Sequence, residues 1–133
     1  MLRLLSISLI NLIATTALAN DIYIDQAGDG NTITVYQSGS AHSATVDILN
    51  GGNSVSVSQS GSADHSATVK IETDNNTANI TQSGVTQNTA SVLISSNSTG
   101  PSTVTLNQTG GATASIVQTC LNPAGCSVVV TQP

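Results

Sequence analysis

The sequence predicts an all-β protein, a β-solenoid of five two-stranded rungs that form two facing parallel sheets. Three observations support this prediction. Short segments alternate between apolar and polar residues with a period of two, which is typical of strands. These segments recur at a near-constant spacing along the chain, with Gly-rich and Asn-rich corners between them. Aromatic residues make up only 2% of the 133 residues, so the large side chains of an ordinary globular core are lacking.

The composition also excludes some classes of function. Charged residues make up 7% of the chain, and the net charge is −5 at pH 7. Arg3 and Lys70 are the basic residues. Because so few cations cannot neutralise a phosphate backbone, we expect no nucleic-acid binding. The abundance of Val, Ile and Thr together with the low charge also argues against a disordered solvating tail.

Residues 1–19 are predicted to be a signal peptide for secretion. Arg3 supplies the positive start, an apolar stretch runs from Leu4 to Leu12, and Ala17-Leu18-Ala19 is a small-x-small cleavage site. The apolar stretch is short and broken by polar residues, which argues against a transmembrane anchor. We therefore expect residues 20–133 to form the mature chain, a single solenoid domain.

One set of predicted strands ends in glutamine. In Asn53–Gln59, for example, Asn53, Val55, Val57 and Gln59 share one face and three serines share the other. Equivalent strands end 22, 23, 26 and 24 residues apart, at Gln37, Gln59, Gln82, Gln108 and Gln132. A helix would place apolar residues three and four apart instead.

A second set of predicted strands lies between the first. It includes Ala44–Ile48, Ala67–Ile71 and Ala90–Ile94, and its ends fall 22, 23, 23 and 24 residues apart, at Gln26, Ile48, Ile71, Ile94 and Gln118. Each unit therefore contributes one strand to each sheet. The corners carry Gly, which supplies the positive φ that tight turns need. The one long insertion, Ser95–Ser102, also falls in a corner.

Rungs stacked about 4.8 Å apart place equivalent side chains above one another. Inward Gln and Asn side chains can then form hydrogen bonds from rung to rung. The predicted structural ladder consists of Gln26, Asn31, Gln37, Asn53, Gln59, Asn76, Gln82, Gln108, Gln118 and Gln132. Ile48, Ile71 and Ile94 are predicted to form a core ladder beside it. We expect these residues to be structural, and none to be catalytic.

Cys120 and Cys126 are the two cysteines, and they enclose a short loop that contains Pro and Gly. After secretion a disulfide between them could persist. A zinc site would need four ligands, and two remote histidines have the wrong spacing to complete one. We therefore predict a disulfide, and neither a metal nor another cofactor.

The repeated motif resembles the curlin repeat, Q-x-G-x-x-N-x-A-x-x-x-Q. Gln26–Gln37 follows this pattern, and Gln82-Ser83-Gly84 followed by Asn88 and Ala90 follows it with one residue inserted. The resemblance covers essentially the whole mature chain. It implies a structural subunit of curli, the functional amyloid fibres of bacterial biofilms. Such a subunit would be secreted, extracellular and displayed at the cell surface as a fimbrium-like fibre that supports adhesion.

The resemblance also implies partners. A curli subunit polymerises with itself and with a second curlin subunit, and it passes an outer-membrane channel with the help of accessory proteins. No small-molecule substrate is expected. The chain departs from the pattern at Ile48, Ile71 and Ile94 and again at His42 and His65, and no long Gly-rich secretion leader follows Ala19. The first and last units keep Gln on both strands, and their sequences resemble the nucleating curlin more than the major one.

Both ends of the predicted stack lack room for a cap. Neither Ile22–Ile24 nor Val128–Val130 is preceded or followed by a polar or helical covering segment. Uncapped rungs present unpaired backbone groups, which can template another chain.

Two other functions fit the sequence less well. An enzyme is disfavoured because His42 and His65 occupy equivalent repeat positions, whereas a catalytic triad needs different groups that converge. An ice-binding or flat-surface-binding solenoid would use outward Thr and Ser columns, which are interrupted here by Asn and Val. If the two histidines point inward, their protonation near pH 5–6 should disfavour assembly. Alternatively, both lie partly exposed at corners.

Overall fold

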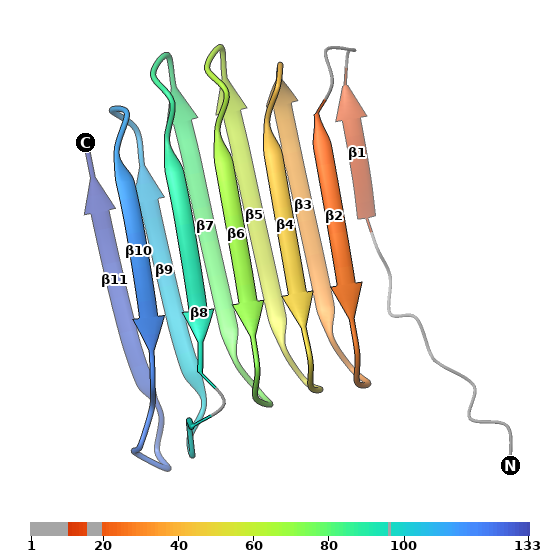
Figure 1. The fold of residues 1–133 in the computed structure, drawn as a ribbon, viewed down its shortest axis with the longest axis vertical. Coiled ribbons are helices and arrows are strands. Elements are labelled where there is room, and N and C mark those ends of the chain that lie inside the picture. The colour runs from red at the N-terminus through yellow and green to blue at the C-terminus, as the bar shows by residue number, and fades with distance from the viewer. Residues whose placement is uncertain (1–10, 16–19, 96) are drawn as a thin grey trace, which may run out of the picture.

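The computed structural model describes residues 11–15, 20–95 and 97–133, and there the chain winds into a β-solenoid (Figure 1). Two parallel sheets face each other, and the chain alternates between them. The described residues are strands joined by short turns, without a helix. The predicted fold class is therefore confirmed. No helix within these residues has the length and apolar character that crossing a membrane would require.

One sheet has six strands and the other has five. The six-stranded sheet runs in the order β1 (Asn11–Thr15), β3 (Thr32–Gly39), β5 (Ser54–Gly61), β7 (Thr77–Gly84), β9 (Ser102–Gln108) and β11 (Cys126–Gln132). The five-stranded sheet runs in the order β10 (Thr113–Gln118), β8 (Thr89–Ile94), β6 (Ser66–Ile71), β4 (Ser43–Ile48) and β2 (Asp21–Gln26). From β2 onward, each pair of consecutive strands makes one rung, which gives the five predicted rungs.

The register of the strands follows the sequence repeat. In the six-stranded sheet Gln37 pairs with Gln59 and Gln59 with Gln82, and in the five-stranded sheet Ile48 pairs with Ile71 and Ile71 with Ile94. Within the middle rungs each strand alternates between buried and more exposed residues, as the period of two predicts. Like side chains consequently stack above like over most of the solenoid.

The apolar core is a narrow slab between the sheets. It consists mainly of Ile, Val and Ala, and the side chains of Ile48, Ile71 and Ile94 are 0% exposed. Four partly buried apolar residues pack against this core, and they lie in the outermost strands β2, β10 and β11: Ile22, Ile24, Ile116 and Val130. They are less buried because each of these strands is paired on one side alone, whereas Ile33 and Val35 of β3 are 3% exposed beneath β1.

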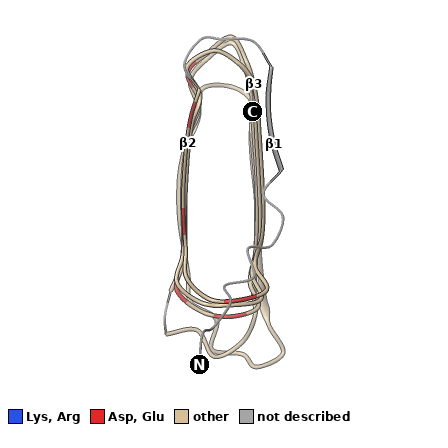
Figure 2. Cartoon of the chain, turned by 90° about the vertical axis from the view of Figure 1, so that its right-hand side faces the viewer, with Lys and Arg blue, Asp and Glu red and all other residues tan. Residues whose placement is uncertain are grey.

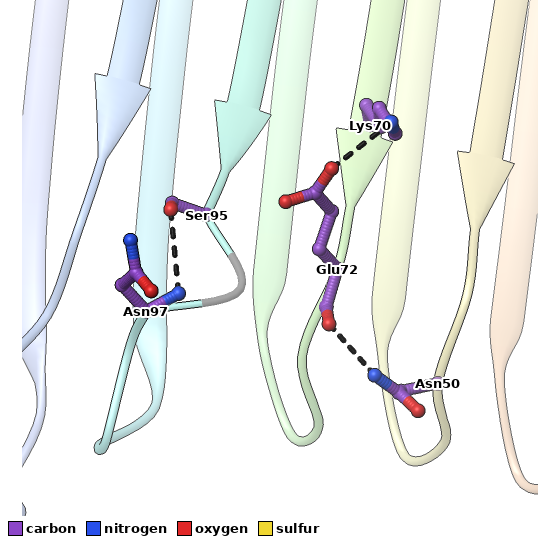
Figure 3. A network of polar contacts seen from close by, with 5 residues as sticks. All are labelled: Asn50, Lys70, Glu72, Ser95 and Asn97. Atoms are coloured by element: carbon purple, nitrogen blue, oxygen red, sulfur yellow. Dashed lines mark hydrogen bonds and ion pairs between the residues drawn. The ribbon is translucent and has the colours of Figure 1, made fainter.

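The corners are also held from rung to rung (Figure 3). Asn50 donates through Nδ2 to the backbone oxygen of Glu72 in the next rung, at 2.7 Å, while Glu72 forms an ion pair with Lys70 at 2.9 Å. In the inserted corner, the Asn97 backbone N–H donates to Ser95 Oγ at 3.3 Å. Some of these bonds therefore lie within one corner, and others join the corners of successive rungs.

Three glycines form a column at the opposite corner. Gly39, Gly61 and Gly84 have φ values of +126°, +127° and +116°, a region that favours glycine. Each lies directly against the backbone carbonyl of the next rung, so a Cβ at Gly61 would overlap the carbonyl of Gly84. The spacing between rungs at this corner therefore depends on glycine.

Strand β1 lies within the predicted signal peptide. It pairs in parallel with β3 and covers the edge of that strand, with Asn11 opposite Thr34. The predicted cleavage site at residues 17–19 lies outside the described residues. The export segment remains a prediction.

Replacing Gly61 tests the glycine column. We expect Gly61→Ala to destabilise the soluble monomer by at least about 2 kcal/mol, because it adds a steric overlap to an unfavourable φ. Gly30→Ala is the matched control, since Gly30 also has a positive φ (+73°) but its added Cβ would meet no atom closer than 3.9 Å. Urea unfolding followed by circular dichroism measures both variants. Equal destabilisation would contradict a role for the close contact.

Candidate functional site

A ladder of glutamine amides runs along the inside of the six-stranded sheet. Each Nε2 donates to Oε1 of the next rung, over 2.8 Å from Gln37 to Gln59, 2.9 Å from Gln59 to Gln82, 3.0 Å from Gln82 to Gln108 and 2.9 Å from Gln108 to Gln132. The first four side chains are at most 2% exposed. All four bonds point the same way, so the ladder has a direction.

Each amide in the middle of the ladder also bridges the two sheets. The second N–H of Gln59 donates to the Ser43 carbonyl at 3.0 Å, and that of Gln82 donates to the Ser66 carbonyl at 3.0 Å. Gln108 reaches the Thr89 carbonyl in the same manner at 3.2 Å. These contacts satisfy both protons of a buried amide, which would otherwise cost free energy.

The two ends of this ladder are chemically complementary. At the N-terminal end Gln37 Oε1 is buried and has no hydrogen-bond partner among the residues that the structure describes. At the C-terminal end Gln132 Nε2 makes only a long contact of 3.5 Å, to the Thr113 carbonyl. One end of the ladder therefore offers an acceptor and the other end a donor.

The predicted asparagines make a second column at the start of the same strands. Asn31 Oδ1 accepts the backbone N–H of Asn53 at 2.8 Å, and Asn53 Oδ1 accepts that of Asn76 at 2.8 Å. Asn76 Oδ1 in turn accepts the N–H of Ser102 at 2.8 Å. Ser102 is therefore the fourth member of the column. Sequence reasoning missed it because its side chain is not an amide and its contact with Asn76 is made by its backbone N–H.

A third column contains the two histidines. Asn20 Oδ1 accepts the backbone N–H of His42 at 2.9 Å, His42 Nδ1 accepts that of His65 at 3.3 Å, and His65 Nδ1 accepts that of Asn88 at 3.2 Å. Asn88 Oδ1 continues the series with the N–H of Ala112 at 2.9 Å. Histidine Nδ1 thus performs the function that Asn Oδ1 performs in the other rungs.

Both histidines point inward. His42 and His65 are 1% and 0% exposed, and their rings stack in parallel with centroids 5.0 Å apart. The alternative that placed them at exposed corners is wrong, because their rings occupy the buried Asn position of the repeat. Since each Nδ1 accepts a hydrogen bond, the proton of each neutral ring lies on Nε2, which faces the carbonyl of Ser38 at 3.1 Å or of Ser60 at 3.0 Å.

Burial lowers the pKa of His65. Desolvation of the charged ring is the largest cause, and the neighbouring His42 acts in the same direction, while the Ser60 carbonyl and Asp64 act against both. A proton on Nδ1 would also face the Asn88 N–H that this atom now accepts. Protonation therefore conflicts with the hydrogen bonding of the column.

Gln26 and Gln118 are not part of the continuous glutamine ladder. Gln26 stacks on Ile48 at one end of the isoleucine column, and Gln118 stacks on Ile94 at the other. Gln26 Nε2 has a contact of 3.4 Å with the Gly28 carbonyl, and within residues 20–95 and 97–133 neither side chain meets another amide. Three isoleucines separate them, so within one molecule they do not join the predicted amide ladder.

Cys120 and Cys126 form a disulfide with a Cα–Cα distance of 5.6 Å. The bond links the segment after β10 to the first residue of β11 and so closes the last corner. Cys120 is fully buried, and its backbone N–H donates to Ser98 Oγ at 2.9 Å. The disulfide thus fixes the start of the last strand.

The two outer faces differ in charge (Figure 2). Strands β3, β5, β7, β9 and β11 contain no charged residue, whereas Asp21, Asp25, Asp47 and Lys70 belong to the five-stranded sheet. The outward columns of the six-stranded sheet hold the predicted Thr and Ser array, which is Thr32, Ser54, Thr77, Thr103 and Ser127 beside Thr34, Ser56, Asn79, Thr105 and Val129. In the described part of the chain, His, Cys, Asp and Glu side chains form no group that could hold a metal ion.

Replacing one glutamine tests the ladder. Gln82→Leu removes a donor to Gln108 and Ser66 and an acceptor for Gln59, so we expect a loss of about 2–4 kcal/mol in the free energy of unfolding. Gln87→Leu is the control, because Gln87 is exposed in the adjoining corner. Urea unfolding of the freshly purified monomer measures the difference. A Gln82→Leu monomer as stable as the control would refute the structural role of the ladder.

The histidine column predicts a dependence on pH. Because the pKa of His65 is lower in the folded chain than its ordinary value of 6.5, the unfolded chain binds the proton more tightly. Stability should be constant above about pH 7, and it should fall as the pH drops below 6.5 towards the lower folded value. Urea midpoints at pH 5 and pH 8 measure this loss.

The double variant His42→Asn/His65→Asn is the control for the pH experiment. It restores the side chain found at Asn20 and Asn88 in the same column, and it removes both imidazoles while keeping an acceptor for the next rung. We expect most of the loss between pH 8 and pH 5 to disappear in this variant. An unchanged loss would assign the pH dependence to the carboxylates instead.

Comparison with known proteins agrees with this arrangement. The family model of the curlin-associated repeat matches three overlapping stretches, residues 17–47, 28–61 and 52–84. Together they span residues 17–84, just over half of the 133-residue chain. No curated protein matches the chain, and no solved structure does. The stacked Gln and Asn columns and these repeated matches show that the chain belongs to the curlin-repeat family.

Proposed function

We propose that this chain is a structural subunit of secreted, curli-type amyloid fibres. It polymerises end to end at the bacterial surface and supports adhesion and the biofilm matrix. The single observation that carries this proposal is the incompleteness of both end rungs. The curlin-repeat family is a family of structural fibre subunits rather than of enzymes, which agrees with it.

The end rungs expose the groups that the middle rungs bury. Ile24 and Ile116 are partly buried, whereas Val46, Val69 and Val92 in the same column are at most 1% exposed. Strands β2, β10 and β11 are the outermost strands of their sheets, so one edge of each is unpaired within the described chain. Another rung of the same shape would cover these groups.

Continuing the repeat defines how two copies would meet. Strands β10 and β11 of one copy would pair with β2 and β3 of the next copy, in the register that joins successive rungs within one copy. The free donor of Gln132 would then face the free acceptor of Gln37 in the next copy. Because the glutamine ladder has a direction, this joint favours a head-to-tail polymer over a symmetric dimer.

Assembly in this mode requires removal of the leader. Strand β1 lies within the predicted residues 1–19 and occupies the edge of β3 that the next copy needs. Cleavage during export would free that edge. The implied partners are a second curlin subunit, an outer-membrane channel and accessory secretion proteins. Within such a fibre this chain would be the major or the nucleating subunit, and its opening segment Ile24–Gly28 and closing segment Val130–Gln132 resemble the nucleating one more.

The purified mature chain, residues 20–133, tests this function. We expect thioflavin T-positive filaments in electron micrographs, and shortening of the lag phase by preformed seeds. Filaments should then contain strands perpendicular to their axis with a repeat of about 4.8 Å. Particles that remain dispersed and single would contradict the proposal, and thermal hysteresis from those particles would support ice binding instead.

Deleting the last strand tests the end-to-end mechanism. A chain that lacks Cys126–Pro133 loses β11 and the terminal donor Gln132, so we expect seeded growth to slow at least about tenfold. Both the deletion and its full-length control carry Cys120→Ser, which avoids a free thiol in one sample alone. Equal growth rates would show that the last rung is not a templating surface.

A further inference from the structure

The isoleucine column differs at its two ends from the rest of its length. It is formed by the last residues of β2, β4, β6, β8 and β10. In the middle it holds Ile48, Ile71 and Ile94, each 0% exposed, and at the ends it holds Gln26 and Gln118. An amide next to a buried isoleucine has no partner in that direction. The amides at the two ends of this column can therefore gain an amide partner only from outside the molecule.

We propose that Gln26 and Gln118 are the specificity pair of the end-to-end joint, which recognise each other in successive copies of this chain. The proposal rests on the proposed function, because the pair forms only where two copies meet. The two residues are the last of β2 and β10, which are the strands that the joint would bring together. Gln118 of one copy would therefore lie directly against Gln26 of the next copy.

The structure supplies the geometry for such a pair. In the glutamine ladder of the six-stranded sheet, glutamines at paired positions bond from amide to amide at 2.8–3.0 Å. Gln118 is already largely buried in the single chain, with 9% of its surface exposed, and a further rung would cover the rest. Gln26 is half-buried, and its contact of 3.4 Å with the Gly28 carbonyl leaves its Oε1 and one N–H available.

The pair distinguishes the correct joint from a slipped one. If the first rung of the incoming copy frayed, β4 would dock on β10 and Ile48 would meet Gln118, which would leave a buried amide unsatisfied. The ladder through Gln37 cannot make this distinction, because every rung offers a glutamine there. A buried polar pair among apolar residues also fixes the register of coiled coils. Here it would fix the register of rungs.

Isoleucine substitutions at both positions test the pair. Gln26→Ile and Gln118→Ile each place an isoleucine against a glutamine at every joint of a homopolymer. We expect each single variant to elongate its own seeds at least about tenfold more slowly than the wild type does, because each joint would contain one unsatisfied buried amide. The double variant places Ile against Ile, as in the middle of the column, so its own growth should return to near the wild-type rate. Gln87→Ile, in an exposed corner, is the matched control.

Two mixing experiments complete the design. The two single variants mixed in equal amounts can alternate, so that each joint is either Gln–Gln or Ile–Ile, and the mixture should grow faster than either variant alone. The double variant and the wild type should seed each other poorly. Thioflavin T kinetics measure the growth rates, and electron microscopy verifies that filaments form. Circular dichroism and a test that the disulfide is intact verify that each monomer folds.

The possible results separate this pair from the proposed function. Suppose that the wild type forms filaments, but the double variant grows even more slowly than the single variants, or the mixture grows no faster than either single variant alone. Either result would overturn the specificity pair and leave the fibre function intact. Absence of filaments from the wild type would overturn both. Slow single variants, a recovered double variant and an accelerated mixture would together support the pair.

Discussion

In-register stacking of identical rungs is the constraint on which this structure depends. Parallel pairing fixes neighbouring strands about 4.8 Å apart, so a side chain meets its own repeat equivalent above and below. A buried amide is therefore satisfied wherever the neighbouring rung carries an amide too, as between Gln59 and Gln82. The same constraint makes Gly61 necessary, because the adjacent carbonyl occupies the space of a Cβ. The polar interior, the close contacts at the corners and the unpaired ends all result from the stacking of rungs in register.

The amide columns also compensate for a thin core. Ile, Val and Ala fill the slab between the sheets, and no Phe or Trp is present in the sequence to widen it. Gln82 binds the rung above, the rung below and the opposite sheet at once, which apolar side chains of the same size cannot do. The ladder thereby keeps successive rungs in register and also joins the two sheets. Its direction is a property of the whole stack, since each amide orients the next.

Most of the fold was predictable from sequence because one rung determines the others. The two sheets and the glutamine column follow directly from the spacing of Gln37, Gln59 and Gln82. The strand ends expected at these glutamines are wrong, because the next two residues still pair in register and β3, β5 and β7 end at glycine. Ser102 was not predictable, since its contact with Asn76 is made by its backbone N–H, and any residue at that position could donate it. The direction of His42 was also open, because a histidine can replace a buried Asn or stay at a corner. Its burial and the position of its Nδ1 against the His65 N–H distinguish the two.

The substitutions within each column separate what stability needs from what assembly needs. His42 and His65 keep the acceptor of the column and so preserve its hydrogen bonds, but burial disfavours the charged form of His65. Ile48, Ile71 and Ile94 give up hydrogen bonding for apolar burial, which is possible because they face one another. Glutamine returns in that column only at the first and last rungs, where the side chain has a neighbouring rung on one side alone. In the proposed fibre these two glutamines would face each other, so the column would contain a matched amide pair at each joint.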